Sequence, residues 1–492
     1  MNLNSKRIKE QIVSLFDKKV FLIFFALFGS FFLAEMCSTS LLYRGDSGGD
    51  SSVFRYVAYA MTNGKIPYRD VFDHKGPLLY LINYLGFVIN KEVGVWFFEF
   101  ISLFITICFV FKIANKVCKN NIFCVITTIL SLSLLANYFQ GGNLTEEYAV
   151  PLIAISIYIF IDYYENNQTS LLKLIICGFC GGCVLMLRPN MAVVWLVFPI
   201  FVLINEVRSK NYKPLAKYGV FFVLGVIIAI VPFITYFLAV GALKDFFDVY
   251  ILFNLEYSAN SGSIISVPKS VYQFMTPLIY LAVVTLLLCI CKRKQILFNF
   301  TYLSCIALTL ISLSMSGFAF GHYGMILVPL LTYPLGVLFA KVKVDFFSKV
   351  VVSSLLVVVF MNSLLFPSVN FAKHIINISN IIKNESIDEI VNYVDENTNE
   401  DDKILVTGNH NILYLKCDRL SASKYSYQSP IVNVRDQILI EFYDEINQEK
   451  PSVIIIPKGL EDYLDMQDFI AEHEYLEMLS NDQYTLYQQK DE

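Results

Sequence analysis

Long apolar runs recur along the first three quarters of the chain and dominate its pattern. A helix needs about 20 apolar residues to cross a bilayer. Runs of about that length occur near residues 20–41, 93–114, 122–139, 147–164, 171–187, 191–205, 218–240, 270–291, 296–314, 323–340 and 347–366. The pattern therefore predicts about 11 transmembrane helices. The segment 76–90 is shorter and starts with Gly76 and Pro77, which favours an interfacial helix.

The last quarter of the chain has a different pattern. Apolar positions at helical spacing predict helices at 386–398 and 432–448, and short runs of apolar residues predict strands at 403–406 and 452–456. We therefore predict three parts: an N-terminus at 1–19, a transmembrane body at 20–366 and a small α/β domain at 367–492.

Composition agrees with this division. Hydrophobic residues make up 56% of the 492 residues and charged residues only 16%, which is unlike a soluble globular chain. The segment 367–492 carries 24 acidic and 10 basic side chains, whereas 1–366 carries 18 acidic and 28 basic ones. The last segment is therefore strongly acidic and the body is basic.

Basic residues fall in alternate loops of the body, as the positive-inside rule requires of cytoplasmic segments. With the N-terminus in the cytoplasm, the inner segments contain Lys112 and Lys116, Lys173, Arg208 and Lys210, Lys292 to Lys294, and Lys341 and Lys343. This topology predicts a multi-pass protein of the plasma (inner) membrane with an extracytoplasmic C-terminal domain. It also predicts a long first outer loop, residues 43–92, that contains interfacial helices.

Cys177, Cys180 and Cys183 have the spacing of a small metal cluster, but they lie in an apolar segment that also contains three glycines. Glycine allows two transmembrane helices to approach closely. Helix packing is therefore the preferred interpretation of this segment, and a metal cluster is the alternative.

Polar and ionisable residues gather in the predicted outer loops, and Asp50 stands at the start of a short amphipathic helix. Any single acid there also fits a hydrated loop or a helix cap. Together, however, such groups at one membrane depth indicate a polar cavity. The first loop holds Asp46, Asp50, Asp70, Asp73, His74 and Lys75, and later loops hold Glu146, Glu147, Arg188, His322 and Tyr323.

The first loop resembles that of the GT-C-fold glycosyltransferases, which use polyprenyl-phosphate sugars and include protein O-mannosyltransferases and lipid A aminoarabinose transferases. The resemblance covers most of residues 20–340. It lies in Asp50 at the start of a helix, the turn from Gly64 to Tyr68, the sequence Lys75-Gly76-Pro77, the pair Thr145-Glu146 and the pair His322-Tyr323. The family often has adjacent acids at the catalytic position, whereas here Asp50 follows two glycines and Asp46 lies four residues earlier.

The resemblance implies an inverting hexosyl- or pentosyltransferase with a GT-C-like fold. Asp50, or alternatively Asp46, would be the general base. Lys75, Arg188, His322 and Tyr323 would hold the lipid phosphate. Asp70, Asp73 and His74 would orient Lys75 or bind sugar hydroxyls, and Glu146 and Glu147 would shape the acceptor side.

The implied partners are a polyprenyl-phosphate sugar, membrane lipids and an acceptor in the bacterial cell envelope, either a glycan, a lipid or a protein. No nucleic acid is expected, and the absence of a glycine-rich phosphate loop argues against a sugar-nucleotide donor. A divalent metal, Mg or Mn, among Asp50, Asp73, His74 and Glu146 stays open because nothing in the sequence fixes a ligand geometry. The rival function is a transporter, flippase or polymerase of lipid-linked saccharides.

Overall fold

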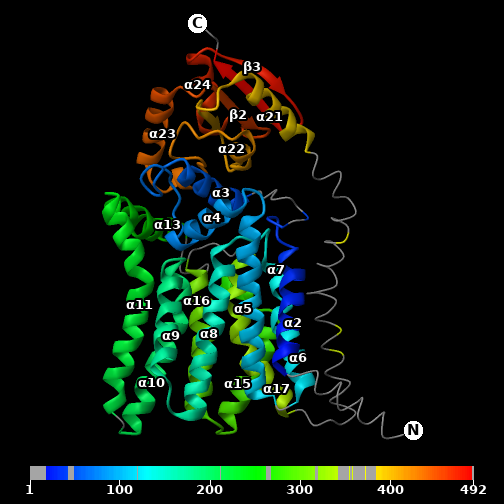
Figure 1. The fold of residues 1–492 in the computed structure, drawn as a ribbon, viewed down its shortest axis with the longest axis vertical. Coiled ribbons are helices and arrows are strands. Elements are labelled where there is room, and N and C mark those ends of the chain that lie inside the picture. Colours follow the sequence, from blue (N-terminus) through cyan, green and yellow to red (C-terminus); the bar gives the residue numbers. More distant parts are fainter. Residues whose placement is uncertain are drawn as a thin grey trace, which may run out of the picture.

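The apolar runs form a helical bundle with a small domain above one end (Figure 1). This computed structural model describes residues 18–40, 42, 49–118, 120–210, 212–261, 267–315, 320–341, 354, 357, 372 and 384–489. Ten of the predicted spans coincide with helices: α2 (Lys18–Ala34), α5 (Gly94–Val117), α6 (Asn121–Leu132), α8 (Thr145–Asn166), α9 (Leu171–Leu185), α10 (Val193–Arg208), α11 (Lys213–Ala239), α15 (Pro277–Cys291), α16 (Ile296–Ser314) and the joined η4 (Gly321–Leu327) and α17 (Val328–Lys341).

Five of these helices are long and apolar enough to cross a membrane: α5, α8, α11, α16 and the joined η4 and α17. The chain is therefore a multi-pass membrane protein. The predicted span at 347–366 lies outside the described residues except at 354 and 357, so the number 11 stays a prediction. Asp46 also lies outside the described residues.

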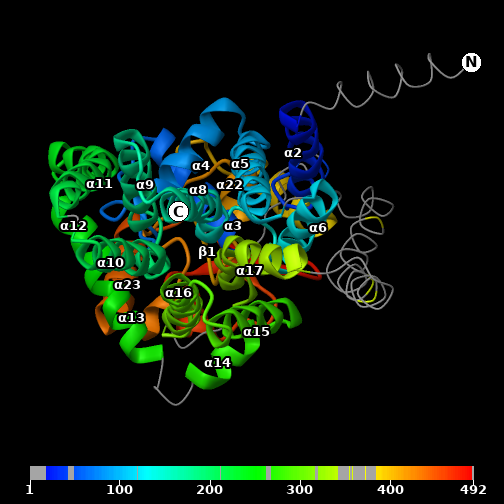
Figure 2. The same ribbon diagram turned by 90° about the horizontal axis from the view of Figure 1, so that it is seen from below.

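Helix α8 lies in the middle of the bundle, whereas α11 lies at its rim (Figure 2). Most side chains of α11 are exposed at the surface of the protein, as expected of a lipid-facing helix. This helix packs against α9 through glycines. A Cβ atom on Gly178 would lie 1.9 Å from the carbonyl oxygen of Phe222, and one on Gly225 would lie 2.1 Å from that of Ile175. The helix-packing interpretation of the cysteine and glycine segment is confirmed.

Two helices of the first loop, α3 (Gly49–Thr62) and α4 (Pro77–Ile89), lie between the bundle and the upper domain (Figure 1). Asp50 falls in the first turn of α3, as predicted. All residues from Ser51 to Ala60 are buried, although the sequence predicted an amphipathic helix with one exposed face. The cause is the C-terminal domain, which covers α3: the rings of Tyr56 and Tyr414 lie 4.8 Å apart.

Short elements complete the body around these helices. They are α7 (Leu135–Tyr138), η1 (Pro189–Met191), α12 (Leu243–Phe247), the π-helical turn η2 (Asp248–Phe253), α13 (Asn254–Ser261) and α14 (Val267–Phe274). Of these, η1 directly follows Arg188, and α13 lies beneath the upper domain (Figure 1).

The C-terminal domain has the predicted α/β character. A four-stranded sheet has the order β1 (Ile404–Val406), β2 (Val453–Pro457), β4 (Tyr484–Gln489), β3 (Tyr475–Ser480), with β1 parallel to β2 and the other pairs antiparallel. Leu405 pairs with Ile454, which pairs with Tyr487. The helical elements are α21 (Glu385–Asn397), α22 (Ile412–Cys417), η6 (Ile431–Asn433), α23 (Asp436–Glu449), η7 (Tyr463–Asp465) and α24 (Met466–Glu472). The two predicted helices correspond to α21 and α23, and the two predicted strands to β1 and β2.

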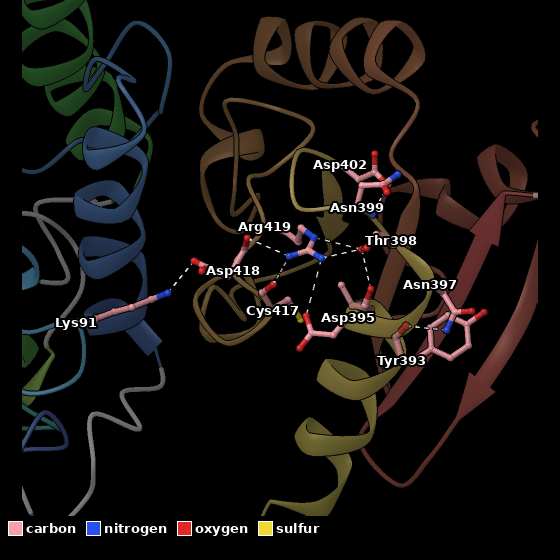
Figure 3. A network of polar contacts seen from close by, with 11 residues as sticks. Lys91, Tyr393, Asp395, Asn397, Thr398, Asn399, Asp402, Cys417, Asp418 and Arg419 are labelled. Atoms are coloured by element: carbon pink, nitrogen blue, oxygen red, sulfur yellow. Dashed lines mark hydrogen bonds and ion pairs between the residues drawn. The ribbon is translucent and has the colours of Figure 1, made fainter.

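Polar contacts attach this domain to the body. Lys91 forms an exposed ion pair with Asp418 (2.7 Å), and the neighbouring Arg419 is buried, where its guanidinium donates to Thr398 and to the carbonyl oxygen of Cys417 (Figure 3). The backbone N–H of Phe72, in the first loop, donates to the carbonyl oxygen of Lys424 (2.8 Å). The domain is therefore in direct contact with the loop that carries the predicted site.

Candidate active site

A cavity of about 670 Å³ lies where the first loop, the α9–α10 connection, η4 and the C-terminal domain meet. Seven of the predicted site residues line it: Asp50, Asp73, His74, Lys75, Arg188, His322 and Tyr323. Its lining also includes several residues that the sequence did not single out, among them Asn190, Tyr250, Tyr257, Asn409 and Tyr427.

Backbone contacts hold Lys75 close to the segment that carries Arg188. The N–H of Gly76 donates to the carbonyl oxygen of Leu187 (3.1 Å), and the N–H of Leu78 donates to that of Met186 (3.1 Å). The approach requires glycine, because a Cβ atom at Gly76 would lie 2.0 Å from the Met186 oxygen. Two cationic residues from distant parts of the sequence are thus fixed in one cavity.

The turn from Gly64 to Tyr68 supports Lys75 from the other side. Gly64 and Tyr68 both have positive φ angles (77° and 71°), and the Tyr68 hydroxyl donates to the carbonyl oxygen of Lys75 (2.8 Å). Asp70 stabilises this turn, since it accepts from the N–H of Ile66 (2.8 Å) and pairs with Arg69 (2.9 Å). Burial raises the pKa of Asp70, but the hydrogen bonds from Arg69 and Ile66 outweigh burial and lower it overall. Asp70 does not line the cavity.

Asp73 is buried within a set of hydrogen bonds. Its Oδ1 accepts from the Tyr427 hydroxyl (2.8 Å) and from the N–H of His74 (2.9 Å), and its Oδ2 accepts from the Tyr80 hydroxyl (2.8 Å). Burial raises the pKa of this carboxyl, although the charge of Lys75 and the two hydroxyls partly offset the effect. Tyr427 belongs to the C-terminal domain, so this carboxylate joins the two parts of the chain.

His74 lies between Asp73 and Lys75. Its Nε2 is 3.1 Å from the Lys75 Nζ, and its Nδ1 is 3.3 Å from the Tyr427 hydroxyl. Burial and the positive charges of Lys75 and Arg188 hold the pKa of His74 well below its usual value. The imidazole is therefore neutral, accepts from the lysine ammonium at Nε2 and carries its proton on Nδ1.

Arg188 is held by two partners on the body side. Its Nη1 is 2.6 Å from Glu146 Oε1, and its guanidinium lies 4.0 Å from the ring centre of Tyr323. Burial lowers the pKa of Arg188, but Tyr323 and Glu146 outweigh burial and raise it, so this residue stays cationic. His322 adjoins Tyr323 and forms a 2.6 Å hydrogen bond between Nδ1 and Gln140. Glu146 thus lies behind Arg188 and does not line the cavity.

Glu147 belongs to a second buried cluster beneath the start of α3. Glu147 and Glu99 both accept from the N–H of Asn143 (2.9 and 2.5 Å), and the side chain of Asn143 donates to Ser51 (3.0 Å). Within the described part of the chain, Cys37, Glu99 and Glu147 are the group whose ligand atoms lie close enough for a metal ion, within 4.8 Å of one another. The cluster supports the first turn of α3, which carries Asp50.

Two of the carboxylates considered for Mg or Mn already have hydrogen-bond partners: Asp73 in the cavity and Glu146 behind Arg188. Both oxygens of Asp73 accept hydrogen bonds, as described above, and Glu146 accepts from Arg188 and from the Thr145 hydroxyl (2.8 Å). These donors satisfy both carboxylates without a metal ion.

Comparisons with known proteins show the family and the fold of this chain. Residues 7–404 match the family model of the competence-induced protein Ccs4 N-terminal domain. The chain belongs to this family. Among curated proteins, none matches the sequence.

Among solved structures, the chain is similar to ArnT from Cupriavidus metallidurans bound to undecaprenyl phosphate, with a TM-score of 0.62 and 11% sequence identity over 95% of this chain and 97% of that chain. The apo state of that ArnT gives a TM-score of 0.59 and 10% identity over 96% and 98% of the two chains. This member of the Ccs4 N-terminal domain family therefore has a GT-C-like fold, as the first loop predicted.

Proposed function

We propose that this chain is an inverting glycosyltransferase that moves a sugar from a polyprenyl-phosphate donor to an extracytoplasmic acceptor. The observation that carries the proposal is the joining of Lys75 and Arg188 in one cavity by the backbone contacts of Gly76. Two cations in a partly buried cavity suit the phosphate of a lipid-linked sugar. The similar ArnT structure holds undecaprenyl phosphate, which supports this class of donor.

In the proposed reaction, the acceptor hydroxyl oxygen attacks the anomeric carbon of the donor sugar. The new glycosidic bond forms as the bond between that carbon and the phosphate oxygen breaks. Asp50, which stands in the first turn of α3 at the cavity, takes the acceptor proton. Polyprenyl phosphate leaves with both bonding electrons, and Lys75 and Arg188 balance its charge.

The remaining predicted residues have supporting roles. His322 and Tyr323 contribute hydrogen bonds to the phosphate side, and Tyr323 also holds the Arg188 guanidinium. Asp73 and His74 position Lys75. Asp70 and Glu146 do not contact the substrate. Asp70 stabilises the turn before Lys75, and Glu146 holds Arg188 in place. Glu147 supports the start of α3.

The proposed orientation places the N-terminus in the cytoplasm and the C-terminal domain outside. Lys116 near the end of α5 and Lys173 near the start of α9 pair with Asp162, near the end of α8, and would then lie on the cytoplasmic side. Transfer would take place at the extracytoplasmic surface of the membrane.

The test uses the purified full-length protein in lipid nanodiscs with an undecaprenyl-phosphate-linked hexose. Replacing Asp50→Asn should lower the rate of sugar release or transfer by about 10²- to 10⁴-fold, the usual contribution of a general base. Asp401→Asn is the matched control, because Asp401 is exposed in the C-terminal domain. An Asp50→Asn protein with the wild-type rate would contradict the proposal. Movement of intact donor across a liposome membrane without transfer would favour the transporter instead.

A further inference from the structure

The C-terminal domain supplies one wall of the cavity. Asn409, Tyr427, Ser429 and Pro430 line it from this side. Asn409 lies in the loop between β1 and α22, at the carboxyl end of a strand that runs parallel to β2. In open α/β sheets, ligands bind at the carboxyl ends of parallel strands. The loop that follows the carboxyl end of β1 therefore reaches the cavity through Asn409.

This loop contains buried polar atoms without partners. Among the described residues, Thr407 Oγ1, Asn409 Oδ1 and Asn411 Oδ1 have no hydrogen-bond partner, and the side chains of Thr407 and Asn411 are fully buried. Asn190 Oδ1, on the body side of the same cavity, likewise lacks a partner within the described part of the chain. Buried polar groups are normally hydrogen-bonded. Of these residues, Asn190 and Asn409 line the cavity, so their unpaired oxygens point to a ligand there.

The chemistry of these groups identifies the class of ligand. An asparagine amide offers an acceptor oxygen and a donor nitrogen, and its terminal torsion is broad enough for either to turn toward the cavity. A hydroxyl group of the ligand both donates and accepts, so it can bond to the asparagine amide whichever of its two atoms faces the cavity. Asn190 follows Arg188 by two residues, and both line the cavity. The rings of Tyr250 and Tyr257 line the same cavity and offer flat apolar surfaces to a sugar ring.

We propose that Asn190 and Asn409 form a subsite for sugar hydroxyls, with one side chain from the body and one from the C-terminal domain. This inference rests on the proposed function and extends it by giving the C-terminal domain a direct role in recognising carbohydrate. The hydroxyls belong either to the donor sugar or to a glycan acceptor, which the same two side chains would recognise by the same chemistry.

The experiment compares full-length Asn190→Ala and Asn409→Ala with the wild type. Asn397→Ala is the matched control, because Asn397 is exposed at the end of α21 (Figure 3) and is not among the residues that line the cavity. Dissociation constants are measured for undecaprenyl phosphate and for undecaprenyl-phosphate-linked glucose. Transfer to a soluble amino-sugar trisaccharide gives the KM of an acceptor.

If the donor sugar occupies the subsite, each variant should bind the glucose-bearing lipid about fivefold or more weakly, the effect of one lost hydrogen bond, and bind undecaprenyl phosphate as the wild type does. If the acceptor occupies it, both lipid affinities stay unchanged, and the KM of the trisaccharide rises at constant kcat. Unchanged values throughout, or equal weakening of both lipids, would overturn the subsite. A wild-type protein that transfers no sugar would refute the proposed function. The affinities for the two lipids would then test the subsite alone. Equal effects of a variant on both affinities would overturn it.

Discussion

The Tyr427 hydroxyl should determine how firmly the C-terminal domain holds the first loop. Tyr427 and Tyr80 each donate to Asp73 at 2.8 Å, but Tyr427 comes from the C-terminal domain and Tyr80 from α4 in the body. Replacing Tyr427→Phe therefore removes a bond between the two parts of the chain. Tyr80→Phe removes an equivalent bond within the body and is the matched control.

A hydrogen bond to a charged group contributes about 1.5–3 kcal/mol. Since 1.4 kcal/mol corresponds to a tenfold change in an equilibrium constant, the local opening between domain and loop should become roughly ten- to a hundredfold more frequent in Tyr427→Phe. The amide of Phe72 reports this opening directly, because it donates across the same interface to Lys424. Its hydrogen exchange should accelerate by that factor.

The measurement is hydrogen exchange of the peptide that contains Phe72, combined with the affinity for undecaprenyl phosphate. Tyr80→Phe should leave the exchange of Phe72 close to wild type. Wild-type exchange in Tyr427→Phe would refute the role of the hydroxyl at the interface. Equal acceleration in both variants would show that the effect comes from the Asp73 environment as a whole.

Two further predictions concern the same loop. Gly76→Ala should lower the melting temperature and weaken undecaprenyl phosphate binding by tenfold or more, because its Cβ would lie 2.0 Å from a backbone oxygen; wild-type binding would contradict the proposed fixation of Lys75. His74 has a pKa well below 6.5 in the folded protein, so the unfolded chain takes up a proton that the folded one does not. The free energy of unfolding should therefore fall as the pH drops below about 6.5, and His74→Asn should lose this part of the dependence in melting curves from pH 8 to 5.

Much of the fold and part of the site could be predicted because they follow local rules. The length of the apolar runs predicted the helices of the bundle, and the spacing of apolar residues predicted α21, α23, β1 and β2. The cavity residues gathered because they all lie at the ends of helices on one side of the bundle. Depth along the membrane normal is a property that a sequence reveals well.

The direction in which a side chain points from its helix or turn was harder to predict. Asp70 and Glu147 were both expected at the site, but Asp70 bonds back to its own loop and Glu147 lies inward beneath α3. The roles of Tyr427 and Asn409 depend on the docking of a domain more than 300 residues away along the chain from the first loop. The only sequence signal for Asn409 was a polar loop after a strand, which many unrelated domains share, and Tyr427, between α22 and η6, had none.

Because two parts of the chain line the cavity, the family match covers only some of the residues that line it. The family match ends at residue 404, before the loop of Asn409 and before Tyr427. The matched region thus contains the cations proposed to bind the phosphate and the proposed base, whereas one wall of the cavity is built by sequence beyond it. Under the proposed function, relatives that share only the matched region keep the site for the lipid phosphate and differ in the wall that would recognise carbohydrate.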